Sequence, residues 1–347
     1  MTVLITGGCG YIGSHVAWAL ADRGHEIQIL DDLSTGHPDN APPQAGLIVG
    51  DVSDPRLLSE AFSQGDVSAV IHLAGKILPA ESVKDPIRYL NENTCKTIAL
   101  LEAMVRAGVR RLVFSSTAAV YGQSEVPKVD EDAATRPMSP YGVSKLMAEQ
   151  AIEVVCAAHD LRATALRYFN VAGVDAALRC GPRGPNPGHL IRTAIQCVRG
   201  VGGPLVVFGD DYETPDGTCL RDYIHVSDLA AAHLSALLDL ETHAGFHVFN
   251  CGYGNGASVL EVIRTVEMVS GKALPYTVGP RRDGDPPALI ADPTRLLETG
   301  TWKPTYSLAE IVRSAMHWDD VGADRARALN DGARQGPHPY PLGRVER

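Results

Sequence analysis

A glycine pattern near the start of the chain constrains the fold more than any other feature. Gly7, Gly10 and Gly13 lie within TGGCGYIGSH, after an apolar run at Val3–Thr6 and at the beginning of a helix-period segment. Glycines permit a tight turn and a close backbone approach to a pyrophosphate, which a helix N-terminus attracts through its free N–H groups. A strand, a glycine turn and a helix in this order predict a dinucleotide site rather than a purely structural turn.

A carboxylate at the end of the next predicted strand favours one cofactor over another. Asp31 can accept hydrogen bonds from the ribose hydroxyls of adenosine but would repel a 2′-phosphate. The residues from Asp32 to Gly36 contain no arginine that could neutralise such a phosphate. We therefore expect NAD, not NADP; the alternative is a solvated turn carboxylate without a ligand.

Strand-length apolar runs alternate with helix-period segments over the first half of the chain, which predicts an α/β fold: a Rossmann-type doubly wound parallel sheet with a smaller C-terminal substrate-binding lobe. We expect the NAD-binding domain at residues 1–175 and the substrate lobe mainly at 176–320. A segment at about 225–262 is expected to return to the first domain, as are the strand near 247–249 and part of the helix near 258–270. Prolines at 337, 339 and 341 predict a loose tail over 321–347.

Composition excludes several classes of function. The chain is 45% apolar with a formal charge of -10, so it lacks the basic surface that nucleic acid or anionic lipid requires. The sequence has no stretch of about 20 apolar residues that could form a membrane span. Because the first predicted strand begins at Thr2, we expect no N-terminal signal segment and therefore a cytoplasmic location. Seven scattered cysteines without a C-x-x-C pair predict reduced thiols, and the histidine spacing predicts no metal site.

The string SPYGVSK carries the candidate catalytic pair. Tyr141 and Lys145 are four residues apart, hence on one helical face, and Ser139 with Pro140 forms a suitable helix start. The positive helix end and the ammonium group are expected to lower the pKa of the phenol toward neutrality. Thr117 ends an earlier strand, where ligands of such sheets bind, and is expected to hydrogen-bond the reacting sugar oxygen; capping its own backbone is the alternative.

Beyond these residues, the chain resembles the UDP-galactose 4-epimerase family of extended short-chain dehydrogenases from Thr2 to about Trp318. The matching strings are TGGCGYIGSH, AESVKDP, FSSTAAVYG, SPYGVSKLMAEQ, LRYFNVAG, FGDDYETPDGTCLRDYIHVSDLA and PRRDGDP. The resemblance implies C4 epimerisation of a UDP-hexose through a 4-keto sugar, with Tyr141 as the base. It also implies a homodimer, for which the segments 86–107 and 140–158 are candidates.

The resemblance assigns roles to further positions. On the cofactor side it implies contacts from Gly7, Gly10, Tyr11, Ile12, Gly13, Asp31, Asp51, Val52, Leu73, Ala74, Asn93, Ser115, Tyr141, Lys145 and Tyr168. On the UDP-sugar side it implies contacts from Thr117, Tyr141, Asn170, Leu190, Phe208, Arg221, Arg282, Asp285 and Leu289. An aromatic face suits uracil, and arginine forks suit phosphate oxygens.

Some positions depart from the family pattern. Leu289 is intermediate in bulk at a position that the family uses to admit or exclude a C2 N-acetyl group, which leaves both outcomes open for UDP-N-acetylhexosamines. Lys76 precedes by one residue the position at which one branch of the family has a cofactor-contacting lysine, so its role is not assigned. The stretch from Cys180 to His189 is shorter and richer in proline than the family pattern, so the role of His189 is not assigned either. A 4,6-dehydratase is disfavoured because Ala118 and Ala119 replace the acidic pair it needs, and a non-enzymatic NAD sensor is disfavoured because Tyr141 and Lys145 are both present.

Overall fold

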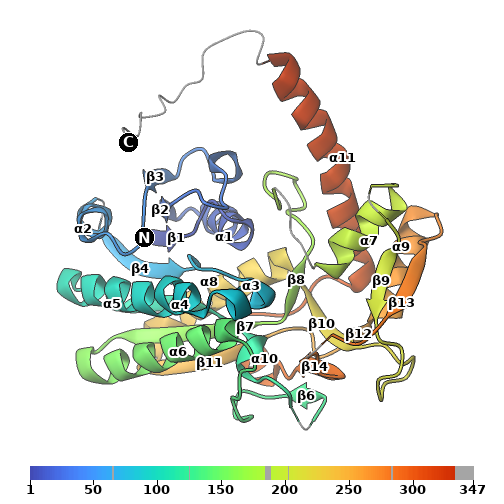
Figure 1. Ribbon diagram of the computed structural model, residues 1–347. Helices are drawn as coiled ribbons and strands as arrows, with labels where there is room; N and C mark the ends of the chain where they lie inside the picture. The colour runs from blue at the N-terminus through green and yellow to red at the C-terminus, as the bar shows by residue number, and fades with distance from the viewer. Residues whose placement is uncertain (65, 125, 184–188, 202, 283, 333–347) are drawn as a thin grey trace.

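The structure, a computed structural model, describes residues 1–332 apart from 65, 125, 184–188, 202 and 283. A seven-stranded parallel sheet forms its larger domain (Figure 1). The strand order is β11-β7-β5-β4-β1-β2-β3, and the order reverses between β1 and β4. In such sheets ligands bind outside the carboxyl ends of the strands at this reversal. The strands are β1 (Thr2–Thr6), β2 (Glu26–Asp31), β3 (Gly46–Val49), β4 (Val67–His72), β5 (Arg111–Thr117), β7 (Arg162–Tyr168) and β11 (Phe246–Cys251).

Helices cover both faces of this sheet. One buried cluster joins Val3, Ile5 and Ile29 of the sheet to α1 (Tyr11–Ala21) and α8 (Val226–Thr242). The other face carries the helices that follow β3, β4 and β5: α2 (Pro55–Ser63), α3 (Pro79–Lys84), α4 (Pro86–Tyr89), a π-helical segment (Leu90–Cys95), α5 (Lys96–Ala107) and α6 (Pro140–His159). The predicted doubly wound fold is therefore confirmed.

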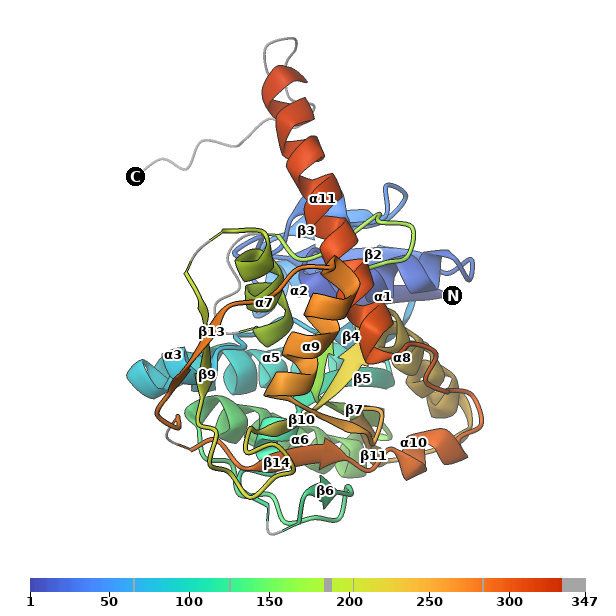
Figure 2. The ribbon, with the colours of Figure 1, turned by 90° about the vertical axis from the view of Figure 1, so that its right-hand side faces the viewer.

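The smaller lobe lies beside the carboxyl ends of the main strands (Figure 2). A second, five-stranded sheet and a two-stranded parallel pair form it, within the described residues, with four further helices. Its elements are β6 (Lys128–Val129), β8 (Asn170–Ala172), α7 (Leu190–Val198), β9 (Leu205–Phe208), β10 (Leu220–His225), β12 (Gly256–Ser258), α9 (Val259–Ser270), β13 (Tyr276–Gly279), β14 (Ala288–Ala291), α10 (Thr294–Glu298) and α11 (Leu308–Gly332).

Two expectations need correction. Strand β11 joins the main sheet beside β7, but α9 does not pack on that sheet: its Val262, Ile263 and Val266 form the core of the smaller lobe with α7 and α11. In addition, α11 continues to Gly332 and extends away from the body in both views, although we expected a loose tail from 321. Residues 321–332 contain three alanines and two arginines, which favour helix. The rest of the predicted tail, 333–347, lies outside the described residues.

All seven cysteines are free, as expected for reduced thiols, and six of them are buried. Among the described residues, no helix has both the length and the apolar character needed to cross a bilayer. The predicted cytoplasmic location stays a prediction.

Candidate active site

The glycine turn after β1 is packed so closely that side chains would not fit. Gly7 has a φ of +73°, and a Cβ there would lie 2.7 Å from the backbone nitrogen of Ala74. A Cβ on Gly13 would lie 2.1 Å from the carbonyl oxygen of Gly7. Gly10 is the N-cap of α1 and supplies no side-chain cap, so the first N–H groups of the helix are left for another acceptor. This arrangement fits the pyrophosphate of a dinucleotide.

Asp31 is buried, with 5% of its surface exposed, so it is not the solvated turn carboxylate that the alternative interpretation requires. Its Oδ2 accepts from the backbone N–H of Cys9 at 2.9 Å, and its Oδ1 accepts from that of Leu33 at 2.8 Å. Burial raises the pKa of this carboxyl, whereas the two backbone hydrogen bonds oppose the rise. Asp31 thus ties the end of β2 to the glycine turn, where a ribose hydroxyl would meet it.

The other cofactor-side positions lie around the ends of β3 and β4. Leu73 and Ala74 directly follow β4, and Asn93 holds the next turn: its Oδ1 accepts from the Lys76 N–H at 2.8 Å, and its Nδ2 donates to the Lys76 carbonyl at 3.0 Å. Asn93 lies in the π-helical segment, a distortion that is frequent at functional sites. Near β3, Val52 is buried, and Asp51 pairs with Lys96 at 2.7 Å.

The predicted catalytic tyrosine lies in the first turn of α6. The Ser139 hydroxyl accepts from the Gly142 N–H at 3.2 Å, and Pro140 is the first helical residue, as the sequence predicted. Tyr141 and Thr117 are each 9% exposed, and the Thr117 side chain acts to lower the pKa of the Tyr141 phenol. The Thr117 hydroxyl also accepts from the Ala119 N–H at 3.2 Å, so it caps its own backbone as well.

Lys145 lies deeper than Tyr141, and its charge is held at the end of β5. Its Nζ donates to the Ser115 carbonyl at 2.9 Å and lies 3.3 Å from the Ser115 hydroxyl. Burial lowers the pKa of Lys145 to about 8, opposed by the charge of Glu149. The Ser115 and Lys145 side chains are 6% and 3% exposed, respectively.

The expected decrease in the pKa of Tyr141 is wrong for the protein by itself. Burial raises the pKa of the phenol, and the hydrogen bond from Thr117 opposes this rise only in part. The ammonium of Lys145 does not reverse it, because that group is itself desolvated and directed at Ser115. A low-dielectric site disfavours an isolated phenolate more strongly than the helix N-terminus favours it.

Tyr168 lies opposite Thr117 in the register of β5 and β7. Its hydroxyl lies 2.5 Å from Nε2 of His233, whose other ring nitrogen lies 2.8 Å from the Leu229 carbonyl, and the Ser115 side chain acts to lower the pKa of Tyr168. The ends of β5 and β7 therefore bring Ser115, Thr117 and Tyr168 together beside the start of α6, and their contacts with cofactor and substrate stay a prediction.

The smaller lobe brings three predicted substrate positions together. Arg221 on β10 and Leu289 on β14 are register partners. The Arg221 guanidinium donates to the Pro286 carbonyl at 2.9 Å and lies 3.4 Å from Oδ1 of Asp285. Leu289 packs against a buried apolar cluster, whose members include Ala118, Phe169 and Ala291.

The remaining substrate positions lie at the ends of other elements of this lobe. Phe208 ends β9, and the Arg282 guanidinium lies 3.9 Å from its ring centroid, so the face expected for uracil carries an arginine in this structure. Asn170 begins β8 and is hydrogen-bonded through its side chain to Tyr223, and Leu190 begins α7.

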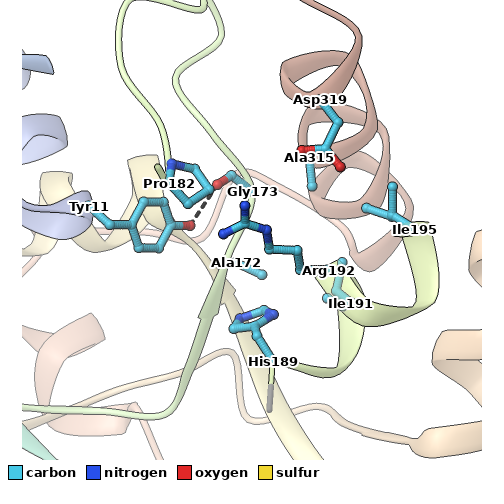
Figure 3. A pocket seen from close by; sticks show the side chains of 10 residues that line it. All are labelled: Tyr11, Ala172, Gly173, Pro182, His189, Ile191, Arg192, Ile195, Ala315 and Asp319. Carbon is cyan, nitrogen blue, oxygen red and sulfur yellow. Dashed lines mark hydrogen bonds between the residues drawn. The ribbon is translucent and has the colours of Figure 1, made fainter. Parts of the chain in front are cut away.

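A small cavity of about 30 Å³ lies where the two domains meet (Figure 3). Tyr11 enters it from α1 and donates to the Gly173 carbonyl at 2.6 Å. Arg192 and His189 enter it from the start of α7. Nε and Nη1 of Arg192 and Nδ1 of His189 are buried, and none of them has a hydrogen-bond partner among the residues that the structure describes. The part of the proline-rich stretch at 184–188 lies outside the described residues.

Sequence reasoning missed two charged residues behind the site. Glu149 and Arg167 form a buried ion pair with 2.7 Å between Oε2 and Nη2. Glu149 follows Tyr141 by eight residues and Lys145 by four, a helical spacing that could have revealed it. Arg167 precedes Tyr168 on β7, but only the tertiary structure shows which carboxylate it meets.

The chain matches the model of the NAD dependent epimerase/dehydratase family over residues 3–252. It is 51% identical over 318 residues to a UDP-glucose 4-epimerase of Azospirillum brasilense, with 91% of each chain covered. A solved UDP-glucose-4-epimerase of Stenotrophomonas maltophila, with bound NAD and formylated UDP-arabinopyranose, has a TM-score of 0.91 at 37% identity and covers 94% of this chain and 99% of its own. The UDP-Glc/GlcNAc 4-epimerase of Campylobacter jejuni has a TM-score of 0.81 at 40% identity, with coverages of 92% and 99%.

These similarities extend through both domains, and they confirm the predicted family, enzyme class and cofactor, NAD. The glycine turn and the Tyr141 site lie inside the matched range. The chain belongs to the NAD dependent epimerase/dehydratase family, among its UDP-glucose 4-epimerases.

Proposed function

We propose that the protein inverts the C4 hydroxyl of a UDP-hexose, interconverting UDP-glucose and UDP-galactose, with Tyr141 as the base and Thr117 and Lys145 as its partners. The observation that carries this proposal is that Tyr141, in the first turn of α6, and Thr117, at the end of β5, lie together at the carboxyl ends of the parallel strands. Both side chains are almost entirely buried, so a sugar bound there would be shielded from water.

The residues around the glycine turn would hold NAD. Gly7, Gly10 and Gly13 give room for the pyrophosphate, Asp31 would accept from the ribose, and Lys145 would contact the nicotinamide ribose. When bound, NAD supplies hydride acceptance and return, together with a positively charged ring.

The protein's own residues manage the proton and the orientation of the sugar. Tyr141 takes the proton of the C4 hydroxyl as the 4-keto sugar forms and returns it to the inverted alcohol. Because burial raises the pKa of Tyr141, the phenol keeps its proton until added positive charge favours its ionisation. Thr117 donates to the reacting sugar oxygen. Arg221, Arg282 and Asp285 hold the UDP group, so the sugar can turn while its anchor stays in place.

Purified protein should convert UDP-glucose to UDP-galactose without added NAD, detected by NMR or chromatography. We expect Tyr141→Phe to lose this conversion by at least about 10²-fold, because proton transfer contributes that much. Tyr276→Phe, at an exposed tyrosine of β13, is the matched control. A 4-keto-6-deoxy product would indicate a dehydratase, and no turnover even with NAD supplied would contradict the UDP-hexose assignment.

We further propose that UDP-N-acetylhexosamines are substrates. Leu289 lacks the length and the hydroxyl of a tyrosine and packs against the apolar cluster to which Ala118, the residue after Thr117, belongs. The similar protein of Campylobacter jejuni is described as a UDP-Glc/GlcNAc 4-epimerase. Epimerisation of UDP-N-acetylglucosamine under the same conditions tests the proposal, and turnover of UDP-glucose alone would contradict it.

A homodimer joined through α5 and α6 is part of the proposal. Val143, Met147 and Val154 are 37%, 44% and 69% exposed and follow helical spacing along α6, with Ile98 of the neighbouring α5 48% exposed. An apolar stripe of this kind is typical of a subunit contact. Light scattering should give twice the chain mass, and Met147→Glu should shift it toward the monomer.

A further inference from the structure

A buried network of polar side chains lies between α6 and the main sheet, one helical turn beyond Lys145. The Arg167 guanidinium donates from Nε to Oε1 of Glu149 at 3.1 Å and from Nη2 to Oε2 at 2.7 Å. The Ser116 hydroxyl donates to the same carboxylate. Glu149 and Arg167 are 3% and 5% exposed, so the pair is almost completely removed from water.

The third nitrogen of the guanidinium is also satisfied. Nη1 of Arg167 donates to the Tyr121 hydroxyl at 3.0 Å and lies 3.3 Å from the Glu131 carbonyl. Tyr121 in turn donates to Oδ1 of Asn250 on β11 at 2.7 Å. The network therefore ties α6 to β5, β7 and β11, and every nitrogen of the Arg167 guanidinium has a partner.

Three members of the network, Ser116, Arg167 and Glu149, are close in the chain to residues of the proposed site. Ser116 stands between Ser115 and Thr117 on β5, and its register partner on β7 is Arg167, directly before Tyr168. Glu149 lies one helical turn after Lys145 and about two turns after Tyr141. A shift of α6 along the sheet would have to break the Glu149 contacts before Tyr141 could move relative to Thr117.

Stability by itself does not require an ion pair at this place. Removing both charges from water is costly, and apolar residues of similar volume often replace a buried pair without loss of stability. Apolar side chains of α6 already pack against the sheet nearby, including Ala148 and Ile152. What an apolar pair cannot provide is the two-pronged contact of a guanidinium with a carboxylate, which determines both distance and orientation.

We propose that the Glu149–Arg167 ion pair is a positioning unit of the epimerisation site, which holds α6 in register with the ends of β5 and β7. It acts through Tyr141, Lys145 and Thr117 and does not touch the substrate. The inference rests on the proposed function. The inference adds to the proposed function that the geometry of Tyr141, the proton-transferring residue, depends on a charged pair outside the site.

The double variant Glu149→Met with Arg167→Met separates positioning from stability. Removing both charges together avoids an unpaired buried charge. We expect the holoenzyme to keep its NAD and its melting temperature to within a few degrees, with KM for UDP-galactose within about threefold of the wild-type value. The kcat should fall by about 10²-fold, as misplacement by about 1 Å can cause. Glu153→Gln, an exposed residue one turn further along α6, should leave both constants unchanged.

A folded double variant with wild-type kcat would overturn the inference, as would one in which only KM rises. If the double variant does not fold, Arg167→Lys tests the inference instead. This variant keeps the positive charge and loses only the two-pronged guanidinium contact with Glu149. A tenfold lower kcat at unchanged KM and melting temperature then supports positioning, whereas wild-type kcat refutes it. Failure of the proposed function is distinguishable, since the wild-type protein would then not convert UDP-galactose at all.

Discussion

Substitution of Gly13 by alanine tests the dinucleotide cradle most directly. The added Cβ would lie 2.1 Å from the Gly7 carbonyl oxygen, whereas ordinary Cβ contacts begin at 3.4 Å, so the turn and the helix must separate by about 1.3 Å (3.4 − 2.1). Such overpacking typically costs about 1–3 kcal/mol of folding free energy. The same displacement moves the N–H groups that would meet the pyrophosphate, and each hydrogen bond lost to a charged group is worth about 1.5–3 kcal/mol.

We therefore expect Gly13→Ala to bind NAD about 10- to 100-fold more weakly, as measured by titration calorimetry after removal of the resident cofactor. Two further glycine-to-alanine variants add smaller steric clashes for comparison. A Cβ on Gly10 would lie 3.2 Å from the Gly7 oxygen, and one on Gly46 would lie 3.9 Å from its nearest neighbour. The wild type and Gly46→Ala should bind NAD equally well, Gly10→Ala more weakly, and Gly13→Ala most weakly. If Gly13→Ala binds NAD as tightly as Gly46→Ala, the cradle is not where we place it.

Three further predictions concern the charged and specificity positions. The pKa of Lys145, lowered from 10.5 to about 8, means that the folded cofactor-free protein binds fewer protons than the unfolded chain between these pH values. The free energy of unfolding of the cofactor-free protein should therefore increase by up to about 3 kcal/mol as the pH rises from about 8 to 10.5. Urea unfolding of Lys145→Met should not show this increase. Equal pH dependence in both proteins would contradict the reasoning. Asp31→Asn should bind NAD at least about tenfold more weakly, because an amide accepts through one oxygen where the carboxylate uses two. Its preference for NAD over NADP should narrow, because the charge that repels a 2′-phosphate is removed, and unchanged NAD binding would exclude Asp31 from the site. Leu289→Tyr should lower kcat/KM for UDP-N-acetylglucosamine at least about tenfold relative to UDP-glucose, because added bulk at this predicted sugar-side position reduces the room for the C2 substituent. An unchanged ratio would place the specificity filter elsewhere.

The sequence alone was sufficient for features that depend on local spacing. The alternation of strand and helix segments predicted the parallel sheet, since parallel strands need crossover connections. The glycine turn after β1 and the start of α6 at Ser139 and Pro140 were recognisable because their geometry is set by residues adjacent in the chain. Family resemblance added the distant positions, such as Arg221 and Leu289, that spacing could not connect.

The tertiary structure decided features that depend on what meets across the fold. Helix α9 was expected partly in the first domain, but its apolar face packs on α7 and α11, and an amphipathic pattern does not say which core a helix joins. The pKa of Tyr141 rises because burial outweighs the helix N-terminus, and burial is a property of the assembled site. The Glu149–Arg167 pair joins residues 18 positions apart on a helix and a strand. Local patterns specify elements and turns, whereas desolvation and ion pairing arise only when those elements pack together.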